Sequence, residues 1–188
     1  MAPPRALLLF LFLSFLFERG WVNASFGVDI SEPVSSTVAS CFAGSSVEHI
    51  IPRAFHSTGT VDTNACSTLE TAKSAGIQNR DVYMFPCPTC SASASSQVST
   101  LLSYLSSTCS GAWSGKVWLD IEGAQYWLGS YSENQKWYQQ LVDACADAPG
   151  VSCGIYASQY EWESLFDDPD WEYGSNLPLC KFTLPTRL

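Results

Sequence analysis

Basic residues are scarce in this chain of 188 residues, which has 9 lysine and arginine side chains against 18 aspartates and glutamates, a net charge of −9. This scarcity argues against nucleic acid as a partner, because binding to phosphates needs Lys and Arg. It also argues against a basic helix lying on a membrane surface. Histidine is rarer still, with two in the whole chain. Neither is near the acidic motif described below, so we predict no metal and no cofactor.

Long apolar runs are missing after residue 17. Residues 6–17 form one apolar stretch, which follows Arg5 and precedes the small residues Ala24 and Ser25. The stretch is too short to span a bilayer, and the pattern is typical of a secretory signal peptide. We therefore expect a signal peptide at 1–24, a mature domain at 25–188, and no membrane insertion after cleavage. The expected location is outside the cell or in a lysosomal or phagosomal lumen.

Cysteine, by contrast, is plentiful, with eight in the chain. An even number of cysteines in a secreted chain indicates a disulfide framework. Cys87 with Cys90, and Cys145 with Cys153, are the pairs closest in sequence and the pairings we expect first.

Strand and helix patterns alternate along the mature chain. Apolar, extended segments predict strands, and segments with helical spacing and Ser or Gly at their ends predict helices. This alternation favours an α/β fold with a parallel sheet or barrel. The expected strands are 26–31, 47–54, 81–85, 116–121 and 151–156, and the expected helices are 34–43, 64–75, 94–105, 131–148 and 158–166.

The most informative segment is residues 117–123, VWLDIEG. Side chains alternate between the faces of a strand, so Trp118, Asp120 and Glu122 share one face. Like charges that close raise the pKa of one partner, which is how glycosidases keep one acid protonated beside an ionised one. A solvated strand end remains the alternative. Asp29 lies in another apolar strand, and strand ends gather at the mouth of an α/β barrel.

Four motifs, in a fixed order along the chain, resemble those of a known family. They are GVDIS at 27–31, VYMF at 82–85, WLDIE at 118–122, and GIY at 154–156 followed by Trp162. Together they resemble glycoside hydrolase family 25, the Ch-type lysozymes or N-acetylmuramidases. FPCPTC at 85–90 and IEG at 121–123, followed by Tyr126 and Trp127, resemble a secreted eukaryotic branch of that family.

The resemblance implies a distorted TIM-like β/α barrel. It also implies hydrolysis of the β-1,4 bond between N-acetylmuramic acid and N-acetylglucosamine in peptidoglycan, for bacterial digestion or defence. By motif position, Glu122 resembles the general acid, Asp120 its partner and Asp29 a third carboxylate at the barrel mouth. Tyr83 resembles a tyrosine that contacts the substrate.

Further residues are candidates for substrate binding. Arg53 follows a strand and either pairs with the acids or is simply exposed. Tyr126 and Trp127 either stack on sugar rings or belong to the core. Tyr156 belongs to the GIY motif. His56 and Asp62, in the loop after Arg53, are expected at the surface.

The resemblance ends near Cys180, and residues 180–188 do not match the family. We therefore expect a barrel that is incomplete at its C-terminal strands, with the activity of this form left open. One alternative is a non-catalytic form that binds peptidoglycan or another carbohydrate. Another is a secreted thiol oxidoreductase using Cys87 and Cys90. For an enzyme, the negative charge predicts better activity at mildly acidic pH, where repulsion from anionic cell walls is weaker.

Overall fold

The computed structural model describes residues 26–109, 111–168, 171–173 and 179–182. The expected signal peptide at 1–24 and the unmatched residues 183–188 lie outside these residues. Within them, no helix is both apolar enough and long enough to cross a membrane.

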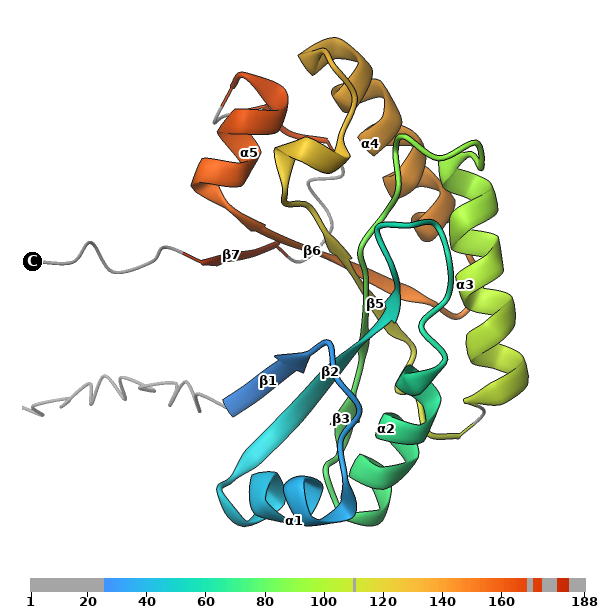
Figure 1. Ribbon diagram of the computed structural model, residues 1–188, viewed down its shortest axis with the longest axis vertical. Helices are drawn as coiled ribbons and strands as arrows, with labels where there is room; N and C mark the ends of the chain where they lie inside the picture. The colour runs from blue at the N-terminus through green and yellow to red at the C-terminus, as the bar shows by residue number, and fades with distance from the viewer. Residues whose placement is uncertain (1–25, 110, 169–170, 174–178, 183–188) are drawn as a thin grey trace, which may run out of the picture.

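The described strands form one curled sheet of seven strands (Figure 1). Its order is β1-β2-β4-β5-β6-β7, with β3 beside β2, and every pairing is parallel. The strands are β1 (Phe26–Ile30), β2 (Val47–Phe55), β3 (Asn79–Arg80), β4 (Val82–Met84), β5 (Lys116–Asp120), β6 (Ser152–Ser158) and β7 (Leu179–Phe182).

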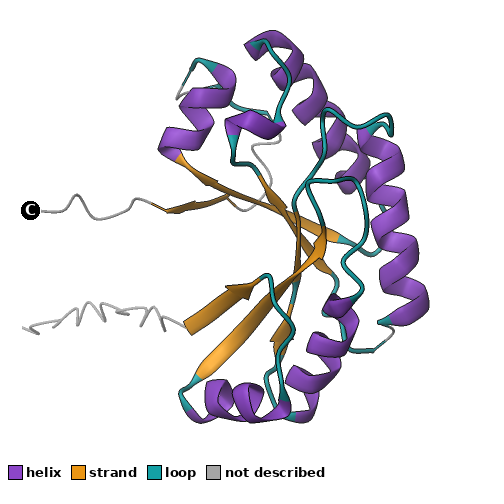
Figure 2. Cartoon of the chain, in the orientation of Figure 1, coloured by secondary structure: helices purple, strands orange, loops and turns teal. Residues whose placement is uncertain are grey.

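Helices connect the strands and lie along the outer side of the curved sheet (Figure 2). They are α1 (Ser36–Gly44), α2 (Asn64–Ser74), α3 (Ala94–Thr108), α4 (Tyr131–Ala146) and α5 (Gln159–Phe166), with a short 3-10 helix η1 (Ala124–Tyr126) after β5. Serine sets the start of four of them, because its side chain accepts a hydrogen bond from a backbone N–H of the first turn. These cap residues are Ser35, Ser93, Ser130 and Ser158.

The main core lies between the sheet and the helices. Leu119 of β5, Leu101 of α3 and Leu141 of α4 are completely buried and belong to one apolar cluster. Leu119 points toward the helices, so the neighbouring positions of β5 point to the opposite, concave side of the sheet. This alternation sends Trp118 and Asp120 to the inside of the curve.

The sheet is a half-barrel in the part of the chain that the structure describes. Its edges are β1 and β7, which are not hydrogen-bonded to each other. The expected α/β fold with a barrel-like parallel sheet is confirmed. Strand β7, where the family resemblance ends, was not among the expected strands, yet it pairs in parallel with β6 from Ile155 to Ser158.

In the part of the chain that the structure describes, three disulfides join these elements. Cys87–Cys90 closes the loop after β4, and Cys145–Cys153 joins the end of α4 to β6. Both pairings were expected from closeness in sequence and are confirmed. The third, Cys66–Cys109, joins α2 to the end of α3 across 43 residues, and no local pattern predicts it. Cys41, exposed on α1, has no disulfide partner among the described cysteines.

Candidate active site

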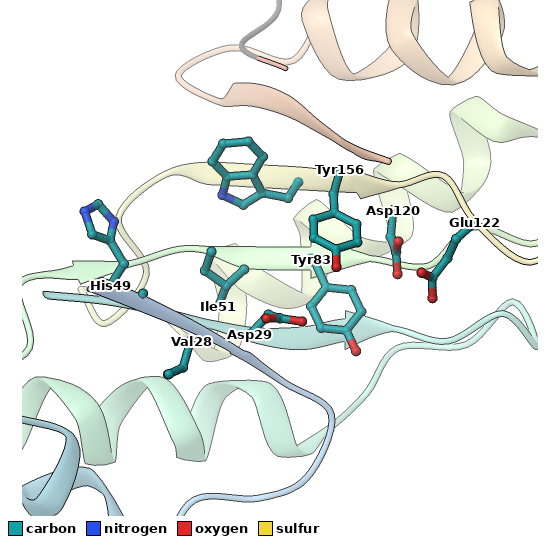
Figure 3. A pocket seen from close by; sticks show the side chains of 10 residues that line it. Val28, Asp29, His49, Ile51, Tyr83, Asp120, Glu122 and Tyr156 are labelled. Carbon is teal, nitrogen blue, oxygen red and sulfur yellow. The ribbon is translucent and has the colours of Figure 1, made fainter. Parts of the chain in front are cut away.

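A cavity of about 310 Å³ lies on the concave side of the sheet (Figure 3). Strands β1, β2, β4, β5 and β6 all contribute to its wall, which brings together residues up to about 130 positions apart in sequence, from Gly27 to Tyr156. This volume is within the usual range for small-molecule sites. The lining residues are Gly27, Val28, Asp29, His49, Ile51, Tyr83, Trp118, Asp120, Glu122 and Tyr156.

The alternation predicted for β5 is confirmed. Trp118, Asp120 and Glu122 all line the cavity, and Val117 and Leu119 are buried in the core on the other side. The strand register places a further cavity residue on each side of β5. Trp118 pairs with Tyr83 of β4, and Asp120 pairs with Tyr156 of β6.

Asp120 is the most deeply buried acid of the cavity, with 6% of its surface exposed. Its Oδ1 atom has no hydrogen-bond partner among the described residues. Burial raises the pKa of Asp120 to about 8, and the negative charges of Glu122, Asp29 and Glu161 add to the effect. Asp120 is therefore protonated at mildly acidic pH.

Glu122 follows β5 and is partly exposed at the cavity. Burial raises its pKa above the ordinary glutamate value, and the charges of Glu161 and Asp29 raise it further. The sequence led us to expect one protonated acid beside one ionised partner. The structure raises the pKa of both carboxyl groups, and Asp120 is the more deeply buried of the two.

Asp29 and Tyr83 complete the polar part of the cavity. Asp29 is exposed on the edge strand β1, and Tyr83 is half-buried on β4. Figure 3 shows both side chains extending into the space that Asp120 and Glu122 face. Burial raises the pKa of Tyr83 to about 12, with Arg53 opposing this shift and the three carboxylates adding to it. Tyr83 therefore keeps its hydroxyl proton and is a hydrogen-bond donor at neutral pH.

Arg53 does not line the cavity. Its Nε atom lies 3.1 Å from Asp62 Oδ2, and its Nη2 donates to the carbonyl of Ser31 at 3.2 Å. His56 Nε2 lies 3.3 Å from the same Asp62 oxygen. Asp62 is 3% exposed, so its expected surface position is wrong. Pairing with the cavity acids was one of the two alternatives for Arg53, and the structure has it paired with Asp62 instead.

Tyr126 and Trp127 also lie outside the cavity lining. Trp127 is buried, with its ring packed edge-on against Trp137 and Phe166, so it has no face free for a sugar. Tyr126 is exposed on η1 and packs edge-on against Phe85. Of the expected binding aromatics, the structure thus brings Tyr83 and Tyr156 to the cavity, and not Tyr126 or Trp127.

Several lining residues were not predicted. His49 and Ile51 lie on β2 at the same spacing as Arg53, and Figure 3 shows His49 at the end of the cavity away from Glu122. Their period of two is the signal that could have found them. His49 contacts Asn79, with 3.3 Å between its Nε2 and the Asn79 Nδ2. Among the described residues, no three His, Cys, Asp or Glu side chains are placed so that together they could hold a metal ion.

Comparison with known proteins finds a matching family, similar sequences and a similar structure. The family described as Lysozyme-like protein 1 matches residues 21–180. Probable GH family 25 lysozyme 2 of Dictyostelium discoideum is 40% identical over 169 residues, covering 90% of this chain and 76% of that protein. Probable GH family 25 lysozyme 5 of the same organism is 36% identical over 154 residues, covering 81% of this chain and 69% of that protein. The structure of a muramidase from Acremonium alcalophilum has the same fold, with a TM-score of 0.63, 20% identity, and coverage of 86% of this chain and 81% of that one.

Proposed function

Because the chain belongs to the lysozyme-like proteins of glycoside hydrolase family 25, we propose that it is a muramidase. It cleaves the β-1,4 bond between N-acetylmuramic acid and N-acetylglucosamine in bacterial peptidoglycan. The observation that carries the proposal is the convergence of Asp29, Asp120 and Glu122 in one cavity on the concave side of a parallel half-barrel.

Glu122 is the general acid in this proposal. Burial and the charges of Glu161 and Asp29 raise its pKa, which favours the protonated carboxyl, and cleavage of a glycosidic bond needs that proton on the leaving oxygen. Asp120 and Asp29 are its partners at the cavity: the protonated Asp120 positions the sugar through hydrogen bonds, and the charge of Asp29, which also acts on Glu122, stabilises positive charge in the transition state. Tyr83 and Tyr156 present hydroxyl groups to the same space.

The raised pKa of Glu122 predicts how the cleavage rate depends on pH. As the pH rises through the pKa of Glu122, the acid loses the proton that it must donate, so the rate falls. The chain also carries a net charge of −9, which repels anionic cell walls more strongly at neutral pH. We expect faster cleavage at mildly acidic pH than at neutral pH.

The test is the release of soluble fragments from purified Gram-positive peptidoglycan, with the reducing-end sugar identified by mass spectrometry. The parent protein should release fragments that end in N-acetylmuramic acid. Glu122→Gln, which keeps the shape of the side chain without its acid, should be at least about 100-fold slower. Glu163→Gln removes the same charge from an exposed position of α5 and should match the parent.

The outcomes separate the alternatives. Retention of the protein on peptidoglycan with no fragment released by the parent would favour the binding form over the enzyme. Equal activity of the parent and Glu122→Gln would contradict the role of Glu122. Fragments that end in N-acetylglucosamine would mean a different glycosidic bond.

The proposal includes the secretory pathway as the route of this protein. Three disulfides support it, because such bonds persist in oxidising compartments. The apolar stretch at residues 6–17 supports it as well. Expression in a eukaryotic cell should deliver the protein to the medium or to an acidic lumen with Ser25 as its first residue. A cytosolic protein that still begins at Met1 would contradict this route.

A further inference from the structure

A single peptide group, the one that joins Glu122 to Gly123, is held at both of its polar atoms. Its carbonyl oxygen accepts a hydrogen bond from Trp127 Nε1 at 3.1 Å. Its N–H donates to Glu161 Oε2 at 2.9 Å. The first partner comes from the core beside η1, and the second comes from α5, 38 residues further along the chain.

The turn at this peptide depends on Gly123. Its φ of 70° and ψ of 72° lie in the left-handed region, which residues with a side chain rarely adopt. A Cβ atom at this position would lie 2.8 Å from Tyr126 Cδ2. The chain therefore leaves β5 through a tight turn immediately after Glu122, and the direction of the Glu122 side chain depends on how firmly that turn is held.

Glu161 reaches this turn from the first turn of α5, which lies beside η1 (Figure 1). Ser158 caps the helix by accepting the Glu161 N–H at 3.1 Å. In a capping box the carboxylate would return to the cap residue, as in α4, where Ser130 Oγ donates to Glu133 Oε2 at 2.6 Å. The Glu161 carboxylate instead binds Gly123, and so it stabilises the turn after Glu122.

We propose that Glu161 is a positioning residue for Glu122, which fixes the peptide after the acid and places a second negative charge beside it. This inference rests on the proposed function only in that Glu122 is taken as the acid. It assigns to Glu161 a role beyond the helix-capping pattern in which its sequence position places it.

The charges around Glu122 give this arrangement a consequence for pH. Acidic groups face it from three elements: Asp29 from β1, Asp120 from β5 and Glu161 from α5. Tyr83 of β4 and Tyr156 of β6 line the same cavity, and Arg53 of β2 is paired with Asp62. Of the neighbouring charges, Glu161 does most to raise the pKa of Glu122. Glu161 thus helps Glu122 to hold its proton at higher pH.

Two substitutions separate the two parts of this role. Glu161→Gln keeps an oxygen that can accept the Gly123 N–H but removes the charge. The pH at which kcat/KM falls on the alkaline side should then move down by about one pH unit, the effect expected from removing a nearby like charge. Glu161→Ala removes the hydrogen bond as well and should lower kcat at its own optimum by a further factor of about 10. Glu163→Gln, on the same helix, is the matched control and should keep the parent profile.

A second readout does not depend on cleavage. In ¹⁵N-labelled protein, the Gly123 amide should exchange with solvent about 10 times faster in Glu161→Ala than in the parent, because its acceptor is gone. Glu122, followed by the ¹³C resonance of its carboxyl, should titrate at lower pH in Glu161→Gln. Near-UV circular dichroism shows whether each variant keeps the native fold, and Glu161→Gln is the variant to rely on where Glu161→Ala does not.

The outcomes are distinct for the two proposals. A parent protein that fails to cleave peptidoglycan contradicts the muramidase proposal, and the exchange rate and titration still test Glu161. A parent that cleaves, with the same pH profile and the same Glu122 titration in Glu161→Gln, would overturn the positioning role.

Discussion

The indole ring of Trp118 lies against Gly154, its partner across β5 and β6, so closely that no larger residue fits. A Cβ atom at Gly154 would lie 2.6 Å from the Cε3 and Cζ3 atoms of the ring. A hydrogen bond also holds the ring, because Asp81 accepts from Trp118 Nε1 at 3.1 Å. The Lys116 ammonium lies 4.9 Å from the ring centroid. These contacts hold the Trp118 ring in place where it lines the cavity.

Gly154→Ala should push Trp118 out of this position. We expect a loss of about 1–3 kcal/mol in the free energy of unfolding, the usual effect of inserting a methyl group into a packed site. Urea denaturation measures this loss. Gly129→Ala is the control, because Gly129 is exposed and a Cβ there meets nothing within 4 Å. Equal stability of the two variants would contradict the contact.

Asp120 should make the stability of the protein depend on pH. Its pKa is about 8 in the fold against an ordinary value of 3.8, so between these values the folded state binds a proton that the unfolded chain lacks. This contribution to stability is complete below about pH 4 and is lost as the pH rises, by about 1.4 kcal/mol per pH unit. Asp120→Asn is neutral throughout. Its melting temperature should rise above that of the parent by an amount that grows from pH 4 to pH 8.

An exposed aspartate provides the comparison for this measurement. Asp147→Asn removes one charge at the end of α4, and its difference from the parent should stay nearly constant over the same range. A constant difference for Asp120→Asn as well would mean that Asp120 is ionised in the folded protein at neutral pH.

Much of this fold follows from local patterns. The alternation of apolar residues in 117–121 is enough to place Asp120 and Glu122 on the face opposite the core. Serines such as Ser130 and Ser158 mark helix starts because their side chains satisfy N–H groups that have no partner in the helix. These effects act over a few residues, so a single sequence contains the information for them.

The incorrect predictions concern residues whose partners lie far away in the sequence, or residues that suit two different surroundings. Trp127 is as suitable for a core as for a sugar site, and only the packing of η1 against α4 and α5 decides between them. The cavity acids were one possible partner for Arg53, but in the folded chain it pairs with Asp62. Glu161 has a capping pattern that correctly predicts a helix start. Its carboxylate binds 38 residues away, which no local pattern specifies.

The disulfides should differ in how much they stabilise the fold. Cys66–Cys109 joins residues 43 apart, and Cys87–Cys90 joins residues 3 apart. On chain-entropy grounds, replacing the first pair with alanine should cost about 4 kcal/mol and replacing the second about 2 kcal/mol. Thermal unfolding of the two double variants measures the difference, with Cys41→Ser, at the exposed free cysteine, as the control. The reverse order would contradict this ranking.

Tyr83→Phe should separate hydrogen bonding from acid–base chemistry at the cavity. The pKa of Tyr83 is about 12, so the hydroxyl keeps its proton throughout the working range and acts as a donor. Its removal should lower kcat/KM on peptidoglycan about 10-fold, the usual effect of losing a hydrogen bond to a charged group. The limbs of the pH profile should stay in place, because no ionisation in that range is lost. Tyr160→Phe, at a position of α5 that is 77% exposed, should match the parent in both respects. If Tyr83→Phe instead abolishes one limb of the profile, Tyr83 ionises during turnover, and the tyrosine rather than a carboxyl group supplies that step.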